Sequence, residues 1–241
     1  MNDPQSSINI LAFGAHPDDV ELGCGGTLAK LAALGKRTAI VDLTEGEMGT
    51  RGSVAERYQE AADAAKVLNV EHRQNLKISD AGIRDTDENR LKLIGVLRTL
   101  RPRMVFAPYP DDRHPDHIHA GNLVRESCFY SGVGKVGPRL GEPFRPEMIL
   151  YYMVSTDFPA LIVSDISEHF DTKVASIKAY RSQFYNPEYE GEETFISSQG
   201  YFDSITSRAS YFGFKAGVRY AEPFWFRGPL LTRNVFNLLD S

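Results

Sequence analysis

The fold class of this chain is decided by residues 8–19, which read Ile-Asn-Ile-Leu-Ala-Phe-Gly-Ala-His-Pro-Asp-Asp. Residues 8–13 form a short apolar run that ends at Gly14, and leucines at helical spacing follow the motif. An apolar run that is bounded by a turn and followed by a helical pattern is typical of a buried strand in a parallel sheet. The stretch therefore predicts a strand–helix unit with polar side chains directly after the strand.

The same alternation continues through the first half of the chain. Ser53 begins one of the helical patterns, and Glu56 follows it at the spacing of a capping box. Strands that alternate with helices in this way predict right-handed βαβ units around a parallel sheet. We therefore expect an α/β fold, a Rossmann-like three-layer sandwich with a mostly parallel central sheet. After the first strand, the expected elements are a helix ending at Gly35, a strand at 38–43, a helix from Ser53 to Leu68, a strand at 72–78, a helix at 88–100 and a strand at 104–107.

The pattern changes after about residue 140. Two further strands are expected at 148–154 and 161–166, and a helix at 167–184. Residues 185–200 are polar and interrupted by Gly and Pro, which is typical of a loop over a site or an interface. Since no internal repeat, low-complexity tract or linker is found, the whole chain, residues 1–241, is expected to be a single domain.

Composition narrows the class of protein. Hydrophobic residues make up 42% of the chain and charged residues 24%, as in a soluble globular protein with a substantial core. The formal net charge of −5 argues against a general nucleic-acid binder, which usually carries a basic face. Residues 1–7 lack the pattern of a signal peptide, and no apolar run approaches the ~20 residues that span a bilayer. We expect a cytoplasmic protein without nucleic-acid or membrane partners, in which Cys24 and Cys128 are buried thiols.

Two groups of His and Asp residues stand where ligand sites form in open α/β sheets. His16, Asp18 and Asp19 follow the first expected strand, and His114 and His117 lie just beyond the fourth. In such sheets the site is at the carboxyl ends of the strands, where the strand order reverses. If the order is the common 3-2-1-4, the first and fourth strands are neighbours at that point. The two groups would then face each other across one crevice.

These side chains suit a catalytic zinc ion, which takes three protein ligands and keeps one position open for water. His16 and Asp19 can bind one ion from a single tight turn, and one of the two later histidines completes the set. His114 and His117 are three residues apart, so both point to the same face if Pro115 starts a helix. The histidine that is not a ligand is then free to act on a substrate.

Asp18 lies between two candidate ligands and, by alternation along the turn, points away from Asp19. A carboxylate beside a zinc-bound water is placed to accept its proton as a general base. Zinc lowers the pKa of such a water towards ~7 and also polarises a carbonyl group. The pattern therefore indicates amide hydrolysis.

Each motif has a simpler explanation when it is taken alone. A His-Pro-Asp-Asp turn is more often a capped helix start, and a single His-Pro-Asp-His is equally weak. Found together, each at the end of a buried strand, they favour a metal site. The glycines of residues 23–27 lack the P-loop and dinucleotide-binding patterns, so they indicate close packing of the first helix or near approach to the metal. We expect no functional role for His72, His119 or His169.

With these residues in view, the sequence resembles the LmbE/PIG-L family of zinc-dependent GlcNAc deacetylases. Residues 15–19, Ala-His-Pro-Asp-Asp, look like the first motif of that family, and residues 114–117, His-Pro-Asp-His, like its second. The resemblance is strongest to the branch that acts in bacillithiol biosynthesis, which removes acetate from N-acetylglucosaminyl malate. It extends over nearly the whole chain, through residues 12–23, 42–52, 112–117, 165–167, 180–184 and 220–222.

The resemblance implies an LmbE-like fold and a set of roles around the metal. His16, Asp19 and His117 would bind Zn²⁺, and Asp18 would be the general base. Fe²⁺ is the alternative metal that His and Asp ligands allow. His114 would serve either as a second acid/base or as a donor to the oxyanion.

Four further residues are expected at the substrate. By the resemblance, Arg57 binds substrate, and Tyr201 donates a hydrogen bond to the oxygen on which charge develops. The simpler explanation of Tyr201 is a ring packed under the loop. Because malate carries two carboxylates, which pair well with arginine, Arg51 and Arg113 are also candidates for substrate binding. An exposed arginine is, however, usually only solvated.

Other features of the resemblance leave alternatives open. Many family members carry Glu directly after Asp-Asp, whereas Val20 intervenes here and Glu21 follows; its default role is compensation of the helix dipole. Members of the bacillithiol branch are often hexameric, so a homo-oligomer is expected. The alternative substrates are chitooligosaccharides and an inositol conjugate of GlcNAc. A different class, a non-catalytic sugar- or nucleotide-binding domain, would have no need of Asp18 between two ligands.

Overall fold

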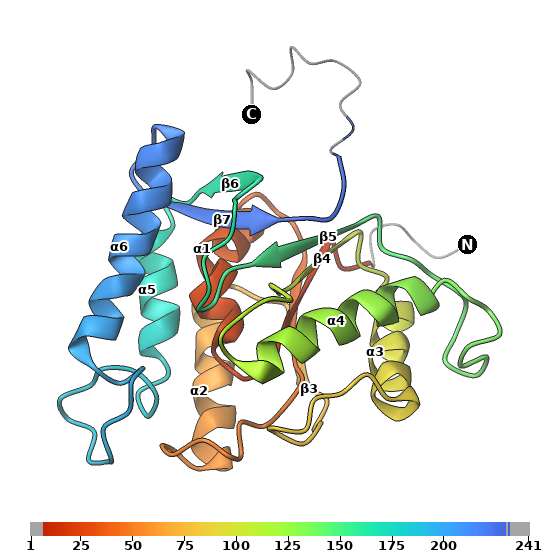
Figure 1. The fold of residues 1–241 in the computed structure, drawn as a ribbon, viewed down its shortest axis with the longest axis horizontal. Coiled ribbons are helices and arrows are strands. Elements are labelled where there is room, and N and C mark those ends of the chain that lie inside the picture. The colour runs from red at the N-terminus through yellow and green to blue at the C-terminus, as the bar shows by residue number, and fades with distance from the viewer. Residues whose placement is uncertain (1–6, 230, 232–241) are drawn as a thin grey trace.

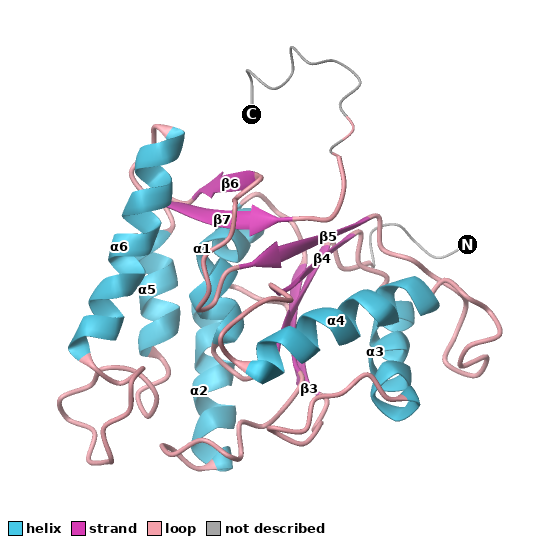
Figure 2. Ribbon diagram, in the orientation of Figure 1, coloured by secondary structure: helices cyan, strands magenta, loops and turns pink. Residues whose placement is uncertain are grey.

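The computed structural model describes residues 7–229 and residue 231; the first part of the polar N-terminal stretch, residues 1–6, lies outside the described residues. A central sheet is covered by helices on both faces, which confirms the expected three-layer α/β fold (Figures 1 and 2). The elements in chain order are β1 (Ile10–Gly14), α1 (Asp19–Ala33), β2 (Thr38–Asp42), α2 (Val54–Val67), β3 (His72–Asn75), α3 (Asp87–Leu100), β4 (Met104–Pro108), α4 (Pro115–Tyr130), β5 (Met148–Tyr152), β6 (Ile162–Asp165), α5 (Phe170–Lys178), α6 (Gln199–Ala216) and β7 (Ala221–Trp225).

The described part of the sheet has the strand order β3-β2-β1-β4-β5-β7-β6. The pairs from β3 to β5 are parallel, while β7 runs antiparallel to both β5 and β6. The predicted order 3-2-1-4 is therefore confirmed, and β1 pairs directly with β4. The chain leaves β1 towards β2 on one side and enters β4 on the other, so their carboxyl ends flank the point where ligand sites form in such sheets.

The two faces of the sheet are buried by different helices. Along β1, Ile10 and Ala12 belong to one apolar cluster, and Leu11 and Phe13 belong to the other, as the two-residue period of a strand requires. The first cluster is closed by α1, α2, α5 and α6, and the second by α3 and α4. Figure 1 shows these two groups of helices on opposite sides of the sheet.

Several local predictions are confirmed. Ser53 caps α2, accepting a hydrogen bond from the backbone N–H of Glu56, whose side chain returns the bond to form a capping box. Gly35, with a φ of 73°, follows the C-terminal end of α1, as expected for a residue that ends a helix. Cys24 and Cys128 are buried and free. None of the described helices is long and apolar enough to cross a membrane.

The glycines of α1 explain how closely that helix approaches its neighbours. A Cβ atom on Gly23 would lie 2.0 Å from the ring of Tyr152, and one on Gly26 would lie 2.7 Å from Ile166. Both distances are far inside van der Waals contact. The expectation that these glycines serve close packing of the helix is therefore confirmed.

The second half of the chain differs from the prediction in three places. The helix expected at 167–184 is shorter, because α5 spans only Phe170–Lys178. A long helix that was not expected, α6, begins after Ser198, whose hydroxyl accepts a hydrogen bond from the N–H of Tyr201. The strand β7 was also not expected. Together, α6 and β7 place Tyr201 and Glu222 close to residues of the first half.

Candidate metal centre and active site

The loop between β1 and α1 folds its acidic side chains back on itself. The carboxylate of Asp19 accepts a hydrogen bond of 2.8 Å from the backbone N–H of His16. Asp18, the N-cap of α1, has a φ of 119°, in a region that residues with a side chain rarely adopt. Strained backbone of this kind collects at functional sites, where the surrounding structure holds it.

The structure brings the three predicted metal ligands together. His117 Nε2 lies 3.1 Å from one carboxylate oxygen of Asp19, and His16 Nδ1 lies 3.5 Å from the other. One potential ligand atom from each of the three residues lies within 4.8 Å of the others. Two imidazoles and one carboxylate are a donor set that zinc accepts in catalytic sites, so the residues fit the metal.

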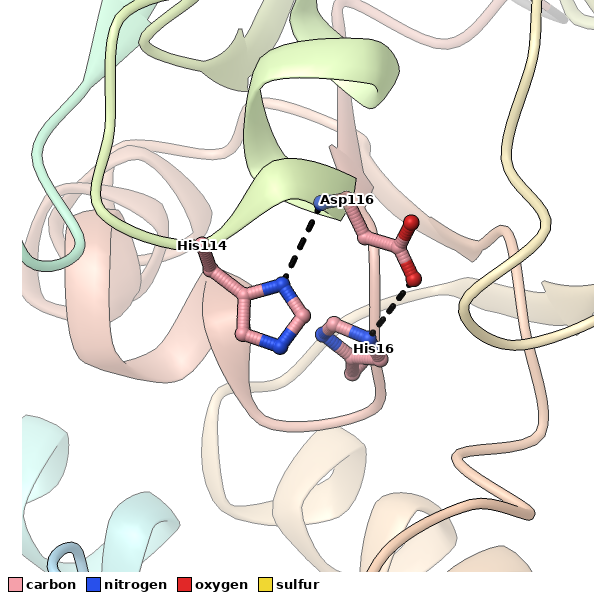
Figure 3. A group of neighbouring side chains, drawn as sticks. All are labelled: His16, His114 and Asp116. Carbon is pink, nitrogen blue, oxygen red and sulfur yellow. Dashed lines mark hydrogen bonds and ion pairs between the residues drawn. The ribbon is translucent and has the colours of Figure 1, made fainter.

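A second possible group consists of His16, His114 and Asp116, shown in Figure 3. The figure shows His114, at the start of α4, with its ring turned towards His16, and the Asp116 carboxylate on the other side of His16. Asp80 and Asp116 lie 3.1 Å and 3.6 Å from the same atom, His16 Nε2. Two carboxylates favour a proton on that nitrogen, which leaves Nδ1, the atom that faces Asp19, as the donor to a metal. The geometry therefore favours His16, Asp19 and His117 as the metal ligands over the group of His16, His114 and Asp116.

Two aspartates that were not expected from the sequence support the candidate ligands. Asp112 lies 3.0 Å from His117 Nδ1, and its second oxygen accepts from the N–H groups of Ser155 and Thr156. Asp80 supports His16 and also accepts a hydrogen bond from the N–H of Met48. A carboxylate on the distal nitrogen is the usual partner of a metal-binding histidine, because it fixes the ring and its tautomer.

The charges in the cluster respond to burial and to one another. Burial raises the pKa of the Asp18 carboxyl to about 7, although the Arg57 guanidinium opposes this effect. Burial lowers the pKa of His114, and the neighbouring His16 and His117 lower it further. In His117, burial lowers the pKa, but the carboxylates of Asp19 and Asp112 together outweigh this effect and raise the pKa to about 9. Because its pKa is lowered, His114 is uncharged at neutral pH and can donate a hydrogen bond.

The three candidate arginines have different surroundings. Arg57 is buried and donates to the carbonyl of Pro17 at 2.6 Å and to the Asp18 carboxylate at 3.3 Å, so it holds the candidate base. Arg51 is also buried, and its guanidinium donates to the carbonyls of Ser182 and Glu192. This arginine therefore ties down the loop between α5 and α6, which a merely solvated side chain would not do.

Arg113 is exposed and lines the cavity of the site. Its guanidinium carbon lies 4.7 Å from the centre of the Phe195 ring. Among the described residues, no hydrogen bond or ion pair occupies this guanidinium. Of the three arginines, Arg113 is thus the one that is most available to a ligand.

A cavity of about 320 Å³ connects these side chains. Tyr201 faces it from α6, and burial raises the pKa of its hydroxyl to about 12, so the hydroxyl is a hydrogen-bond donor at neutral pH. Its ring also packs parallel to that of Phe184, which accounts for the packing role considered for it. The segment expected to cover a site supplies Thr194 and Ile196 to the wall. The cavity is lined by His16, Asp18, Asp19, Leu22, Gly46, Met48, Gly49, Thr50, Arg51, Arg57, Asp80, Ala81, Arg113, His114, His117, Val154, Ser155, Gln183, Thr194, Ile196 and Tyr201.

Glu21 lies outside this cavity. It is fully buried and accepts a hydrogen bond of 2.6 Å from Arg73 and one of 3.1 Å from the hydroxyl of Tyr180. Arg73 also forms two hydrogen bonds with Asp42. Its surroundings are those of a buried ionic cluster behind the loop, which answers the question that the sequence left open.

The fold and the site define a class of protein, α/β proteins that carry a candidate His/Asp metal site, and comparisons with known proteins identify the family. Residues 11–128 match the family model described as PIG-L: GlcNAc-PI de-N-acetylase. Diacetylchitobiose deacetylase of Thermococcus kodakarensis is 30% identical over 241 aligned positions, which cover 94% of this chain and 86% of that protein. The chain belongs to this family of deacetylases, as the sequence predicted.

Two further similarities bear on the fold and on the branch of the family. The solved structure of the conserved protein TT1542 from Thermus thermophilus superposes with a TM-score of 0.85 at 40% identity, covering 95% of this chain and 98% of that one. A probable N-acetyl-α-D-glucosaminyl L-malate deacetylase 2 of Bacillus cereus is 25% identical, over 73% of this chain and 83% of that protein. These similarities support the fold and the family, but they do not single out the bacillithiol branch.

Proposed function

We propose that this protein is a metal-dependent N-deacetylase that hydrolyses the acetamide of a GlcNAc conjugate, with His16, Asp19 and His117 as the ligands of Zn²⁺. The observation that carries the proposal is the convergence of these three side chains, from β1–α1 and α4, beside the buried carboxylate of Asp18. Fe²⁺ is the alternative metal for these ligands. A bound metal supplies Lewis acidity, which favours ionisation of the attacking water and polarises the amide carbonyl.

The protein side chains then move and hold the protons. Asp18 accepts a proton from the attacking water while Arg57 holds its carboxylate in place. The water oxygen bonds to the acetyl carbon, the C–N bond breaks, and the proton on Asp18 passes to the departing nitrogen. Acetate and a free amine result.

Two donors face the oxygen on which negative charge develops. His114 Nδ1 accepts from the backbone N–H of Asp116, so its proton is on Nε2. As an uncharged imidazole, His114 suits donation to the oxyanion better than the role of a second acid, and the hydroxyl of Tyr201 is the other donor. Donors fixed before the reaction stabilise the transition state because they need no reorganisation.

For the substrate, we propose N-acetylglucosaminyl malate. The support is the resemblance of residues 42–52 to the bacillithiol branch and the available guanidinium of Arg113, which can pair with a malate carboxylate. A neutral disaccharide such as diacetylchitobiose is the second candidate, favoured by the Thermococcus relative that aligns with most of the chain. The proposal also includes a single-domain cytoplasmic enzyme that forms a homo-oligomer, a hexamer by family resemblance.

The test is the release of free amine from N-acetylglucosaminyl malate, GlcNAc, diacetylchitobiose and the inositol conjugate, measured together with the metal content of the purified protein. We expect stoichiometric metal and the fastest release from the malate conjugate. No stoichiometric metal and no activity after zinc addition would refute the enzyme proposal. Equal rates on all four substrates would refute the malate assignment alone.

A further inference from the structure

Helix α1 is interrupted inside the core, close to the candidate metal centre. Cys24 has a φ of −146° and a ψ of 18°, which are not helical values. The break separates a short first segment, residues 19–23, from the long remainder of the helix. That short segment carries Asp19, and Asp18 immediately precedes it. The position of both carboxylates therefore depends on what holds the short segment.

A buried ion pair occupies the break. Lys173 of α5 donates to the carbonyls of Glu21 and Leu22, at 3.1 Å and 2.8 Å. Its ammonium lies 2.5 Å from the carboxylate of Glu222, which comes from β7. The side chains of Lys173 and Glu222 are each only 3% exposed. The cation thus gives the carbonyls at the end of the short segment a charged donor.

Glu222 completes the other side of the break. One of its oxygens accepts from the N–H of Gly26 at 3.0 Å, and the other accepts from the N–H of Thr27 at 2.7 Å. A carboxylate in this place caps the start of the long segment and matches the positive end of its dipole. The pair therefore provides one cap for each helical segment, with the matching charge at each.

A second cation reaches the short segment from α6. Arg208 donates to the carbonyl of Leu22 at 3.4 Å and also to the carbonyl of Val154. Leu22 and Val154 both line the cavity of the candidate active site. Arg208 follows Tyr201 by seven residues, so both lie on the same side of α6. The contacts of Arg208 tie the short segment to the helix that carries the candidate oxyanion donor.

Stability alone explains the ion pair poorly. Replacing a buried ion pair by apolar groups of similar volume is often neutral or stabilising, since both charges lose their hydration. A pair that caps two segments instead determines the backbone conformation between them. We propose that Lys173 and Glu222, with Arg208 as a further anchor, are positioning residues of the deacetylase: they keep α1 broken at Cys24 and so hold Asp19 against His117. This inference rests on the metal site of the proposed function.

The test compares the double variant Lys173→Met/Glu222→Gln with the wild-type protein. Both replacements are uncharged and similar in shape, so neither charge of the pair is left without the other. Zinc affinity is measured by competition with a chelator, kcat and KM with the best substrate, and Tm on the metal-free protein. We expect zinc binding to weaken about 10-fold to 100-fold, the range seen when supports of metal ligands are lost. We also expect kcat to fall at least as much as kcat/KM.

Arg98→Met provides the matched control. Arg98 is a buried cation that donates to the carbonyls of Ser131, Val133 and Gly137, and α3 places it on the opposite face of the sheet. This variant should lower Tm and leave zinc affinity unchanged. Unchanged zinc affinity and kcat in the double variant, with only a lower Tm, would overturn the inference.

Two further variants keep the inference testable if the double variant does not fold. Lys173→Arg retains the cation and should keep most of the zinc affinity. Arg208→Met removes only the anchor on α6 and should weaken zinc binding. Unchanged zinc affinity in this variant would overturn the role of Arg208 as an anchor of the short segment. If the wild-type protein itself binds no zinc, the metal site of the proposed function fails, and this result is distinct from a failure of the positioning pair.

Discussion

One carboxylate oxygen of Asp19 lies 3.1 Å from His117 Nε2, although the two residues belong to different strand–helix units. The contact exists because β1 and β4 are neighbours in the sheet, so the turn after one strand faces the helix after the other. The contact brings together two short motifs, residues 16–19 and 114–117, neither of which indicates a metal site when taken alone. Together they form one candidate set of metal ligands.

Removal of His117 should abolish the metal site. In His117→Ala, one imidazole is missing from the three-residue donor set, and we expect the purified protein to lose stoichiometric zinc and its activity. Metal analysis after gel filtration measures this directly. His119→Ala, on the same helix but outside the cavity lining, is the control and should keep its zinc. Normal zinc content in His117→Ala would exclude His117 as a ligand.

Loss of the general base should separate catalysis from metal binding. Asp18→Asn keeps the size of the side chain, and asparagine tolerates a positive φ better than most residues. We expect normal zinc content and a fall in kcat of roughly 10²-fold to 10⁴-fold, the usual contribution of general-base catalysis. Single-turnover rates with matched metal loading measure the effect. A near-normal kcat would assign the proton transfer to another group.

The support of His117 by Asp112 should be visible in metal affinity. In Asp112→Asn, the carboxylate that faces His117 Nδ1 is lost, and we expect zinc to bind about 10-fold to 100-fold more weakly. Chelator competition measures the change, and circular dichroism checks that the fold is retained. Unchanged affinity would show that the ring is held by packing alone.

Arg113 should discriminate between charged and neutral substrates. No residue within the described part of the chain forms a hydrogen bond or ion pair with its guanidinium. This group can therefore pair with a carboxylate, and such a hydrogen bond contributes about 1.5–3 kcal/mol. In Arg113→Gln, we expect KM for N-acetylglucosaminyl malate to rise roughly 10-fold or more, with little change for diacetylchitobiose. Steady-state kinetics on both substrates provide the comparison. An equal effect on the two substrates would remove Arg113 as the determinant of charge.

Close packing at Gly23 should make it intolerant of a side chain. A Cβ there would lie 2.0 Å from the ring of Tyr152, so we expect Gly23→Ala to lower the free energy of unfolding by at least about 1–3 kcal/mol. Gly200 in α6 has open space around it, and Gly200→Ala should raise stability by about 0.5–1 kcal/mol. Urea unfolding of both variants tests the contrast; equal stability of the two variants would contradict it.

The parts that sequence predicted are those set by local patterns. The apolar runs at residues 8–13 and 104–107 identified two parallel strands, whereas their pairing was expected only if the strand order was the common 3-2-1-4. The structure has that order, and the pairing of β1 with β4 brings His16 and His117 together. The strand β7 was missed because it contains Glu222 and Pro223, and proline normally argues against an inner strand. Helix α6 had a detectable signal, since Ile205, Ala209 and Phe212 recur at helical spacing.

The missed parts of the candidate site depend on tertiary contacts. Asp80 follows β3 at the same edge of the sheet as His16, but its neighbours Ser79 and Gly82 indicate only a turn. Arg57 was expected to bind substrate. Its contact with Asp18 was not expected, because that contact depends on how the loop at 44–52 folds. Gly46, with a φ of 68°, lets that loop pass close to the guanidinium. No local sequence pattern contains this information.

If His16, Asp19 and His117 hold one catalytic metal ion, titration of zinc into the metal-free protein should restore activity in proportion to the zinc added. Amine release from the best substrate is followed as zinc is added, beside His117→Ala under the same conditions. We expect activity of the wild-type protein to rise linearly and level off at one zinc per chain, and activity of the variant to stay near zero. Full activity without metal, or equal activation of His117→Ala, would contradict this assignment of the metal ligands.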